Sequence, residues 1–253
     1  MSVNRAELVN YTNKILAIEK FRDYCPNGLQ VEGSENIKKI VAGVTACQAL
    51  IDAAAEQQAD LILVHHGYFW KGESEPLVGI KGRRIKTLMQ SNINLLAYHL
   101  PLDAHAELGN NAQLAAVLGI NVEDGLEPGN PYSVGNIGTI AQACSAENFA
   151  AHVAQMLGRE PQLISGGARS VKRVAWCTGS AERMIEQADA LGADMFISGE
   201  ISEPVVHYAR EAGIHYLGAG HHATERYGVQ ALGKHLAEHF DLDYQYIDID
   251  NPV

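Results

Sequence analysis

The feature that most constrains the fold is an internal repetition of a strand–helix–strand pattern. Residues 38–64 and residues 172–198 both read as a strand, a helix and a second strand, and a shift of 134 positions superimposes them. The shift aligns residues of like character, which are Lys38 with Lys172, Ile40 with Val174, Leu50 with Met184, Ile51 with Ile185, Asp60 with Asp194 and Leu63 with Ile197. Alternating strands and helices predict an α/β fold of two intertwined, duplicated halves, with mixed, mostly parallel sheets covered by helices.

Apolar periodicity and turn residues predict the individual elements. In the first half we expect helices at 5–18, 46–58, 81–91 and 108–118, and strands at 29–31, 40–44, 61–64 and 93–98. In the second half we expect strands at 137–142 and 214–219 and a helix at 146–157, in addition to the repeat. The predicted division is a first half at 1–125, a second half at 126–220 with an insertion at 126–170, and a C-terminal helix and strand at 221–253 that pack back on the first half.

Composition narrows the class of protein. Hydrophobic residues make up 47% of the chain and charged residues 19%, which suits a folded core. The net charge of −11 argues against nucleic-acid binding, because an acidic surface repels phosphates. No apolar run reaches the ~20 residues of a membrane helix, and the N-terminus has no signal core. The sequence therefore predicts a soluble, cytoplasmic protein, with its four cysteines as free thiols.

Polar side chains follow the predicted strands at their carboxyl ends. His65 and His66 come directly after the strand at 61–64, and Asp103 lies just past the strand at 93–98. His221 follows the strand at 214–219, and Glu225 lies four residues later, on the same side of a helix that begins near 222. Ligands of α/β sheets bind beyond the carboxyl ends of the strands, so these side chains are the candidate site.

Three imidazoles and two carboxylates are too many ligands for a single catalytic zinc ion with an open position. They suit two divalent ions bridged by a carboxylate, which together can activate water. Each cluster also has a simpler explanation: His65 and His66 as a structural pair, the residues around Asp103 as a turn, and His221 as a helix cap. Zinc, manganese, iron and nickel all fit the donor set, so the sequence leaves the identity of the metals open.

The remaining candidates are weaker. Glu200 occupies the repeat position that matches His66 and is a candidate for an outer-shell or substrate-facing group. Five other histidines are interpreted as surface or core residues; they are His152, His207, His215, His235 and His239. No phosphate-binding loop and no nucleophile elbow is present.

Several motifs taken together resemble one family, the GTP cyclohydrolase I type 2 homologues, over essentially the whole chain. The motifs lie at residues 26–33, 64–67, 99–105 with 109–111, 199–200 and 220–225. The resemblance implies a dinuclear site with ligands His65, His66, Asp103, His221 and Glu225, in which Glu225 bridges the two ions. His222 is not a ligand position in the family pattern. The resemblance also implies two intertwined α/β halves and a ring-shaped homohexamer.

The family name implies metal-dependent hydrolysis of GTP, with opening of the guanine imidazole ring and release of formate. In this hypothesis Glu225, His99 and His105 are the candidates for moving protons. Two alternatives remain open. One is a metal-ion carrier or metal-binding scaffold without turnover, and the other is a metal-dependent phosphoesterase or amidase that uses the same ligands.

Overall fold

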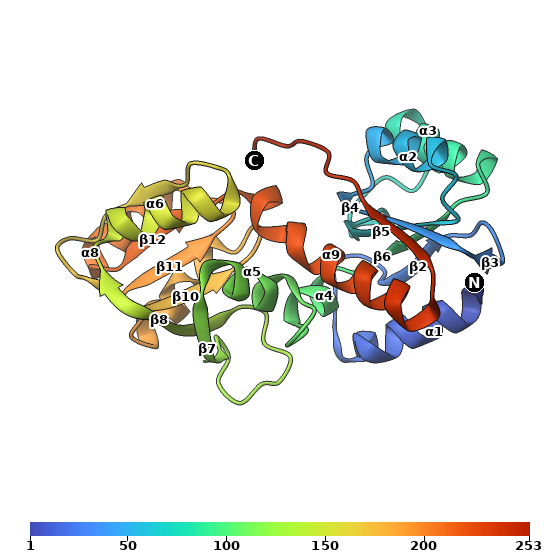
Figure 1. The fold of residues 1–253 in the computed structure, drawn as a ribbon. Helices are drawn as coiled ribbons and strands as arrows, with labels where there is room; N and C mark the ends of the chain where they lie inside the picture. Colours follow the sequence, from blue (N-terminus) through green and yellow to red (C-terminus); the bar gives the residue numbers. More distant parts are fainter. The chain divides into compact units, whose positions relative to one another are not determined.

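The computed structural model describes residues 1–253, which form two compact units that alternate along the chain (Figure 1). Unit 1 contains residues 1–102 and 228–250, and unit 2 contains residues 103–227 and 251–253. Residues 103–125, which the sequence analysis assigned to the first half, belong to unit 2 because β7 (Ile120–Gly125) pairs with β8 (Asn136–Cys144). A sequence pattern cannot reveal this pairing, since β7 is a largely exposed edge strand.

Unit 1 is built around a five-stranded sheet with the order β13-β4-β5-β6-β2. Its strands are β2 (Gly28–Val31), β4 (Lys39–Thr45), β5 (Leu61–His66), β6 (Asn94–Ala97) and β13 (Asp243–Tyr246). β13, β4, β5 and β6 are parallel neighbours, and β2 closes one edge as an antiparallel strand. A short antiparallel pair joins β1 (Val3–Asn4) to β3 (Asn36–Ile37).

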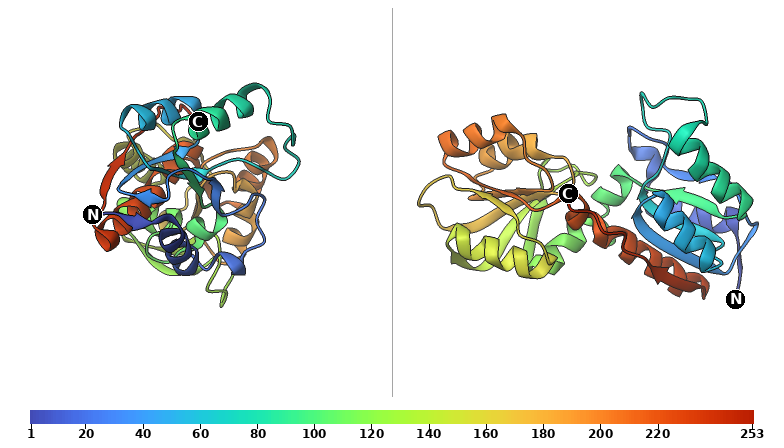
Figure 2. Two further views of the ribbon diagram at one scale, coloured as in Figure 1. Left: turned by 90° about the vertical axis from the view of Figure 1, so that its right-hand side faces the viewer. Right: turned by 90° about the horizontal axis from the view of Figure 1, so that it is seen from above.

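Helices cover both faces of this sheet (Figures 1 and 2). The helices of unit 1 are α1 (Arg5–Ile15), α2 (Gln48–Glu56), α3 (Gly79–Gln90) and the part of α9 (His221–Phe240) from residue 228 onward, with a 3-10 turn, η1 (Ile18–Lys20). α2 and α3 lie on one face, and α1 and α9 lie on the other. The Asn4 side chain accepts a hydrogen bond from the Ala6 amide at 2.9 Å and so caps α1.

Unit 2 contains a six-stranded sheet with the order β7-β8-β10-β11-β12-β9. The remaining strands are β9 (Gln162–Ile164), β10 (Val171–Cys177), β11 (Met195–Ser198) and β12 (His215–Gly218). Only β10, β11 and β12 are parallel neighbours, so the mixed sheet is mostly antiparallel outside its centre. The mixed α/β fold class is confirmed, and the mostly parallel pairing holds for unit 1.

The two faces of the second sheet bury different residues of the same strands. Val174 and Trp176 pack toward α5 (Asn110–Leu118) and α6 (Ala146–Leu157). Ala175 and Cys177 pack toward the opposite face, with α7 (Ile185–Ala190) and α8 (Glu203–Ala212). This alternation is the two-residue period of a strand that is covered on both faces. The short helix α4 (Leu100–Ala104) and the 3-10 turn η2 (Glu182–Met184) complete the elements.

The structure contains the predicted repeat, which is visible in its hydrogen bonds. Asp60 Oδ2 accepts from the backbone amides of Lys38 and Lys39 at 2.8 and 3.0 Å. Asp194 Oδ2 accepts from the equivalent amides of Lys172 and Arg173 at 3.0 and 2.8 Å. Each carboxylate therefore anchors the first strand of its repeat, β4 or β10, to the next parallel strand. No helix of the structure combines the length and the apolarity that a membrane-spanning segment requires.

These two carboxylates generate a stability prediction. Asp60→Ala and Asp194→Ala each leave two backbone donors without their acceptor, so each variant should lose roughly 1–3 kcal/mol of unfolding free energy. Urea unfolding followed by circular dichroism measures the loss. Asp52→Ala, at an exposed position of α2, is the control and should change stability by less than about 0.5 kcal/mol. Equal stability of all three variants would contradict the anchoring role.

Candidate metal centre

The histidine pair of unit 1 lies at the carboxyl end of the apolar strand β5. His65 is fully buried, and its Nδ1 lies 2.8 Å from the carbonyl oxygen of Tyr98. A carbonyl oxygen can only accept, so Nδ1 carries the proton and Nε2 of the neutral ring carries the lone pair. This arrangement is typical of histidines that ligate metals through Nε2, because the outer hydrogen bond fixes the tautomer.

His66 is also oriented by an oxygen on its Nδ1. Strand β5 extends through His66, and His66 Nδ1 lies 3.2 Å from Thr45 Oγ1 at the end of the neighbouring strand β4. Adjacent residues of a strand normally point to opposite faces. Here the two imidazole centroids are nevertheless 4.5 Å apart, with a tilt of 47°, so both rings reach the same place at the strand end.

His99 completes a group of three histidines within unit 1. One ring nitrogen of each of His65, His66 and His99 lies within 4.8 Å of the others. His99 Nδ1 lies 2.7 Å from Asp23 Oδ1, and the Asp23 side chain is almost fully buried. Burial alone would raise the pKa of Asp23, but hydrogen bonds from His99 and Asn27 hold it below its usual value.

Asp23 and Asn27 also fix the backbone that follows β6. Asp23 Oδ2 accepts from the Leu100 amide at 3.0 Å, and Asn27 Oδ1 accepts from the His99 amide at 2.7 Å. These bonds cap the start of α4, the helix that carries Asp103. The turn at 23–27 therefore sets the position of His99 and the start of the segment that leads to Asp103.

In unit 2, Asp103 is a buried carboxylate that is held by two side chains. Its Oδ1 accepts from Asn110 Nδ2 at 2.9 Å and from Thr178 Oγ1 at 3.3 Å. Burial raises the pKa of the Cys177 thiol well above its usual value, and the charges of Asp103 and Glu225 raise it further. Cys177, the last residue of β10, therefore stays a neutral thiol.

His221 lies between two carboxylates at the start of α9. Its Nδ1 lies 2.6 Å from Glu200 Oε1, and its Nε2 lies 3.0 Å from Glu225 Oε2. Burial by itself lowers the pKa of His221, but the hydrogen bonds and charges of Glu225 and Glu200 outweigh it and raise the pKa to about 9. Without a metal, His221 is therefore an imidazolium at neutral pH, and a cation on Nε2 must displace its proton.

Gly179 keeps space open beside these two groups. It has φ of +68°, and a Cβ atom at this position would touch Glu225 Oε1 and lie 3.2 Å from His221 Nε2. Its carbonyl oxygen accepts from the amides of Gly199 and Glu200 and from Ser198 Oγ. Glycine is required here both by the backbone conformation and by the space that the carboxylate occupies.

The donor chemistry fits divalent cations. His65, His66 and His221 each have an oxygen beside Nδ1, and Asp103 and Glu225 are buried carboxylates next to the Thr178–Gly179 turn. The structure brings His65, His66 and His99 together within unit 1, and His221, Glu225 and Glu200 together within unit 2. Zinc, manganese and iron accept such mixed nitrogen and oxygen donors.

The other predicted histidine lies in a different setting. His105 Nδ1 accepts from the amides of Glu107 and Leu108 at 3.2 and 3.0 Å, so this ring caps a turn of the backbone. It lines a hollow of about 240 Å³ beside the segment at 122–136. The histidines interpreted as surface or core lie in α6, α8, β12 and α9; they are His152, His207, His215, His235 and His239.

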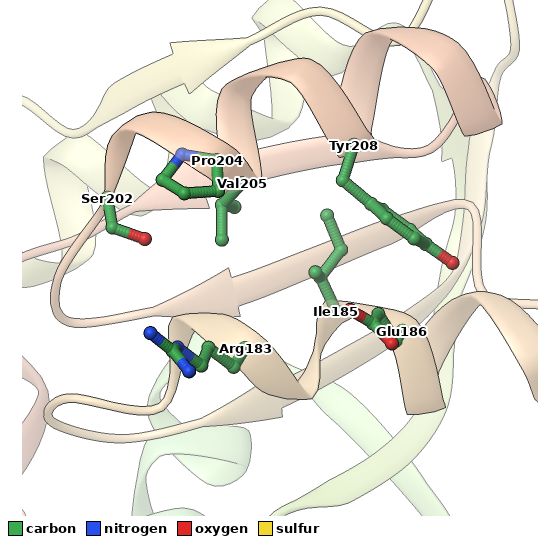
Figure 3. A pocket seen from close by; sticks show the side chains of 7 residues that line it. All are labelled: Arg183, Ile185, Glu186, Ser202, Pro204, Val205 and Tyr208. Carbon is green, nitrogen blue, oxygen red and sulfur yellow. The ribbon is translucent and has the colours of Figure 1, made fainter.

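A larger hollow, of about 380 Å³, lies elsewhere in unit 2 (Figure 3). It is lined by residues from η2, α7 and the start of α8, which are Arg183, Ile185, Glu186, Ser202, Pro204, Val205 and Tyr208. None of the predicted ligands lines it, and its charged side chains are one arginine and one glutamate. The hollow is therefore not the candidate metal centre.

Sequence reasoning missed the groups that orient the ligands. Asp23, Thr45 and Thr178 were not singled out, because their roles depend on neighbours in space rather than in sequence. One signal was available: Gly179 occupies the repeat position of Thr45. The carboxyl ends of the equivalent strands β4 and β10 therefore each place a residue beside the candidate donors. His65 is oriented by a backbone carbonyl, for which no side-chain signal exists.

The fold and the clustered donors define an α/β protein that carries candidate metal-binding groups at its strand ends. The chain belongs to the family described as Duf34/NIF3 (NGG1p interacting factor 3), whose model matches residues 3–252. The "GTP cyclohydrolase 1 type 2 homolog" of Pseudomonas aeruginosa is 54% identical over 253 residues, covering 100% of both chains. The Escherichia coli protein of the same name is 50% identical over 252 residues, covering 99% of this chain and 100% of that protein.

Solved structures agree with this assignment. A protein described as ybgI, of unknown function, has a TM-score of 0.95 and 49% identity, covering 99% of this chain and all of that chain. A protein from Thermus thermophilus has a TM-score of 0.90 and 36% identity with the same coverage. The family resemblance noted in the sequence is thereby confirmed.

Gly179 provides a test of the fit to metal. Gly179→Ala should reduce metal binding strongly, because the added methyl group meets the Glu225 carboxylate. Gly119→Ala is a matched control, since Gly119 has the same φ of +68° and nothing within 4 Å of a Cβ atom. Both variants should lose about 1 kcal/mol from backbone strain, but only Gly179→Ala should lose bound metal, measured by elemental analysis. Full metal content in Gly179→Ala would contradict the proposed fit.

The raised pKa of His221 predicts how the metal-free protein responds to pH. Its pKa rises from 6.5 to about 9 on folding, so its stabilising contribution is complete below pH 6.5 and is lost as pH rises through 9. Urea midpoints of the chelator-treated protein should therefore fall over this range. Glu200→Gln removes one carboxylate charge and should move the fall to lower pH. Glu203→Gln, whose partner is the exposed His207, is the control and should keep the wild-type profile.

Proposed function

We propose that the chain binds two divalent cations through His65, His66, Asp103, His221 and Glu225, and that it uses them to hydrolyse a purine nucleotide. The observation that carries the proposal is the pair of differently held imidazoles beside buried carboxylates: the Tyr98 carbonyl fixes Nδ1 of His65 as the protonated nitrogen, and His221 Nε2 lies 3.0 Å from the buried carboxylate of Glu225. An oxygen that holds the outer ring nitrogen is typical of histidines that ligate metals. Two bound cations supply Lewis-acid chemistry and a water of lowered pKa.

GTP is the substrate that we propose, on the strength of the name borne by the relatives of about 50% identity. In the proposed reaction one water adds at C8 of guanine and the C8–N9 bond breaks, which opens the imidazole ring and leaves a formyl group on N7. A second water then hydrolyses this formamide, so that formate leaves and N7 remains as an amine. The chain must position the base, hold the ions and move protons between the water and the ring nitrogens.

His99 is well placed to move such a proton. Asp23 holds its Nδ1, as the carboxylate of a hydrolytic triad holds its histidine, and so leaves Nε2 as the atom that exchanges the proton. Glu225 is the second candidate, through its contact with His221 Nε2. For His105 the role stays a prediction, since its Nδ1 accepts from two backbone amides and caps a turn.

Formate release tests the proposal. Separate samples of protein loaded with two equivalents of manganese, zinc or iron(II) are mixed with GTP, and the formate released is measured. The wild type should release one formate per GTP consumed with at least one metal. The double variant His66→Ala, Asp103→Ala should release none, because it loses one donor from each unit. His207→Ala, at an exposed position of α8, should keep the wild-type rate.

The metal content of each sample decides how a negative result is read. Protein that holds two ions per chain and releases no formate with any of the three metals would overturn the proposed reaction. Retained turnover in a variant that has lost its metal would overturn the proposed role of the ions. Assembly into a ring-shaped homohexamer stays a prediction, and light scattering of the purified protein tests it.

A further inference from the structure

Two aromatic side chains in unit 1 flank His99 and have no part in the roles described so far. The Trp70 ring lies 4.9 Å from the His99 ring and nearly perpendicular to it, and it lies 5.9 Å from His66. The Tyr24 ring lies 6.4 Å from the His99 ring, at 63° to it. Trp70 and Tyr24 come from separate loops, and we call this pair of rings the aromatic site.

The loops hold the aromatic site in place. Trp70 Nε1 donates to the Gly67 carbonyl at 3.1 Å, and the Trp70 amide donates to Glu73 Oε2 at 3.1 Å. The amide of Lys71 donates to the Tyr24 carbonyl at 2.7 Å, which joins the two loops next to both rings. The indole is therefore fixed before any ligand arrives, and a ligand does not have to order it.

The backbone beside Trp70 is strained. Phe69 has φ of +65°, a left-handed conformation that is rare for a bulky aromatic residue. Such strain persists only where the surroundings enforce it, and it is found mainly at functional sites. Here the strained residue directly precedes the indole that faces the histidines, so the strain serves to place Trp70.

Tyr24 is exposed and Trp70 is partly exposed, unlike the large aromatic residues of the core. Tyr24 is 62% exposed and Trp70 is half-buried, whereas Trp176 and Tyr98 are fully buried. Exposed, rigid aromatic rings bind planar π-systems by stacking, and nucleobases are bound in this way whatever their identity. The exposed Lys71, next to Trp70 in sequence, adds a cation suited to an anionic group on the same ligand.

We infer that the aromatic site binds the planar heteroaromatic part of the substrate, with the base stacked on Trp70 and Tyr24 alongside it. The inference rests on the proposed function, because it assigns the aromatic site to the substrate of the metal centre. Trp70 then selects substrates that carry a planar ring. Recognition of the base is thereby assigned to side chains other than those that hold the ions.

Binding of GTP, measured apart from turnover, tests the inference. Equilibrium dialysis at 4 °C with labelled GTP and zinc-loaded protein should show binding that is about tenfold weaker in Trp70→Leu, within the range of one base–aromatic stack. Trp70→Phe keeps a ring and should recover most of the affinity. Tyr132→Leu, which removes an exposed aromatic ring from unit 2, is the matched control and should bind as the wild type does.

Two further readouts make the result specific. GTP should quench the tryptophan fluorescence of the wild type, because Trp70 is the accessible indole of the two in the chain. Tripolyphosphate, which has no ring, should bind equally to the wild type and to Trp70→Leu. Thermal unfolding by circular dichroism verifies that the variants are folded.

The outcomes separate the inference from the proposed reaction. Equal GTP affinity in the wild type and in folded Trp70→Leu would overturn the inference, even if formate is released. Saturable GTP binding that depends on Trp70, without formate release, would support the aromatic site and overturn the proposed reaction. Absence of GTP binding to the wild type would overturn the inference.

Discussion

Parallel pairing of the central strands is the constraint on which the rest of the structure depends. β4, β5 and β6 run in the same direction in unit 1, and β10, β11 and β12 do so in unit 2. The carboxyl ends of three strands therefore meet at one edge of each sheet. Polar side chains that follow these strands can lie close together without a long loop. The carboxylates of Asp60 and Asp194 secure this pairing by accepting backbone amides at the opposite end of the strands.

Imidazoles that are to bind a cation must also be held in a fixed orientation. Different groups hold the rings in the two units. A backbone carbonyl holds His65, a hydroxyl lies against His66, and carboxylates hold His99 and His221. The charge of the partner matters: beside two carboxylates, the pKa of His221 rises to about 9, whereas a neutral carbonyl fixes the tautomer of His65 without adding a charge. Two imidazoles among the candidate donors therefore lie in different electrostatic environments, His65 beside a neutral carbonyl and His221 between two carboxylates.

Much of the fold was predictable because it is encoded in local periodicity. The apolar run at 61–64, the cap at Asn4 and the repeat that relates Asp60 to Asp194 all have direct counterparts in the structure. The edge strands β7 and β9 were missed, since edge strands carry little burial signal. The limit of unit 2 at residue 103 depends on the pairing of β7 with β8, and β7 was not predicted because it is largely exposed.

The candidate donors were also predictable, because histidines and acids at strand ends stand out against apolar strands. The residues that orient them were not, because Asp23 reaches His99 across 76 positions of sequence and Thr178 reaches Asp103 across 75. The family resemblance identified the chain, but it could not indicate which oxygen holds each ring.

Gly179 has a consequence for how the gene can vary. Every missense change of a glycine codon adds a side chain, and each replacement here brings a Cβ atom against the Glu225 carboxylate at a left-handed backbone position. Compensation by a neighbour is difficult, since the Gly179 carbonyl accepts from Gly199, Glu200 and Ser198 and cannot move without disturbing all three. Missense alleles at this codon should therefore be removed by selection, while those at Gly119, with the same backbone angle and open space, should be tolerated far more often.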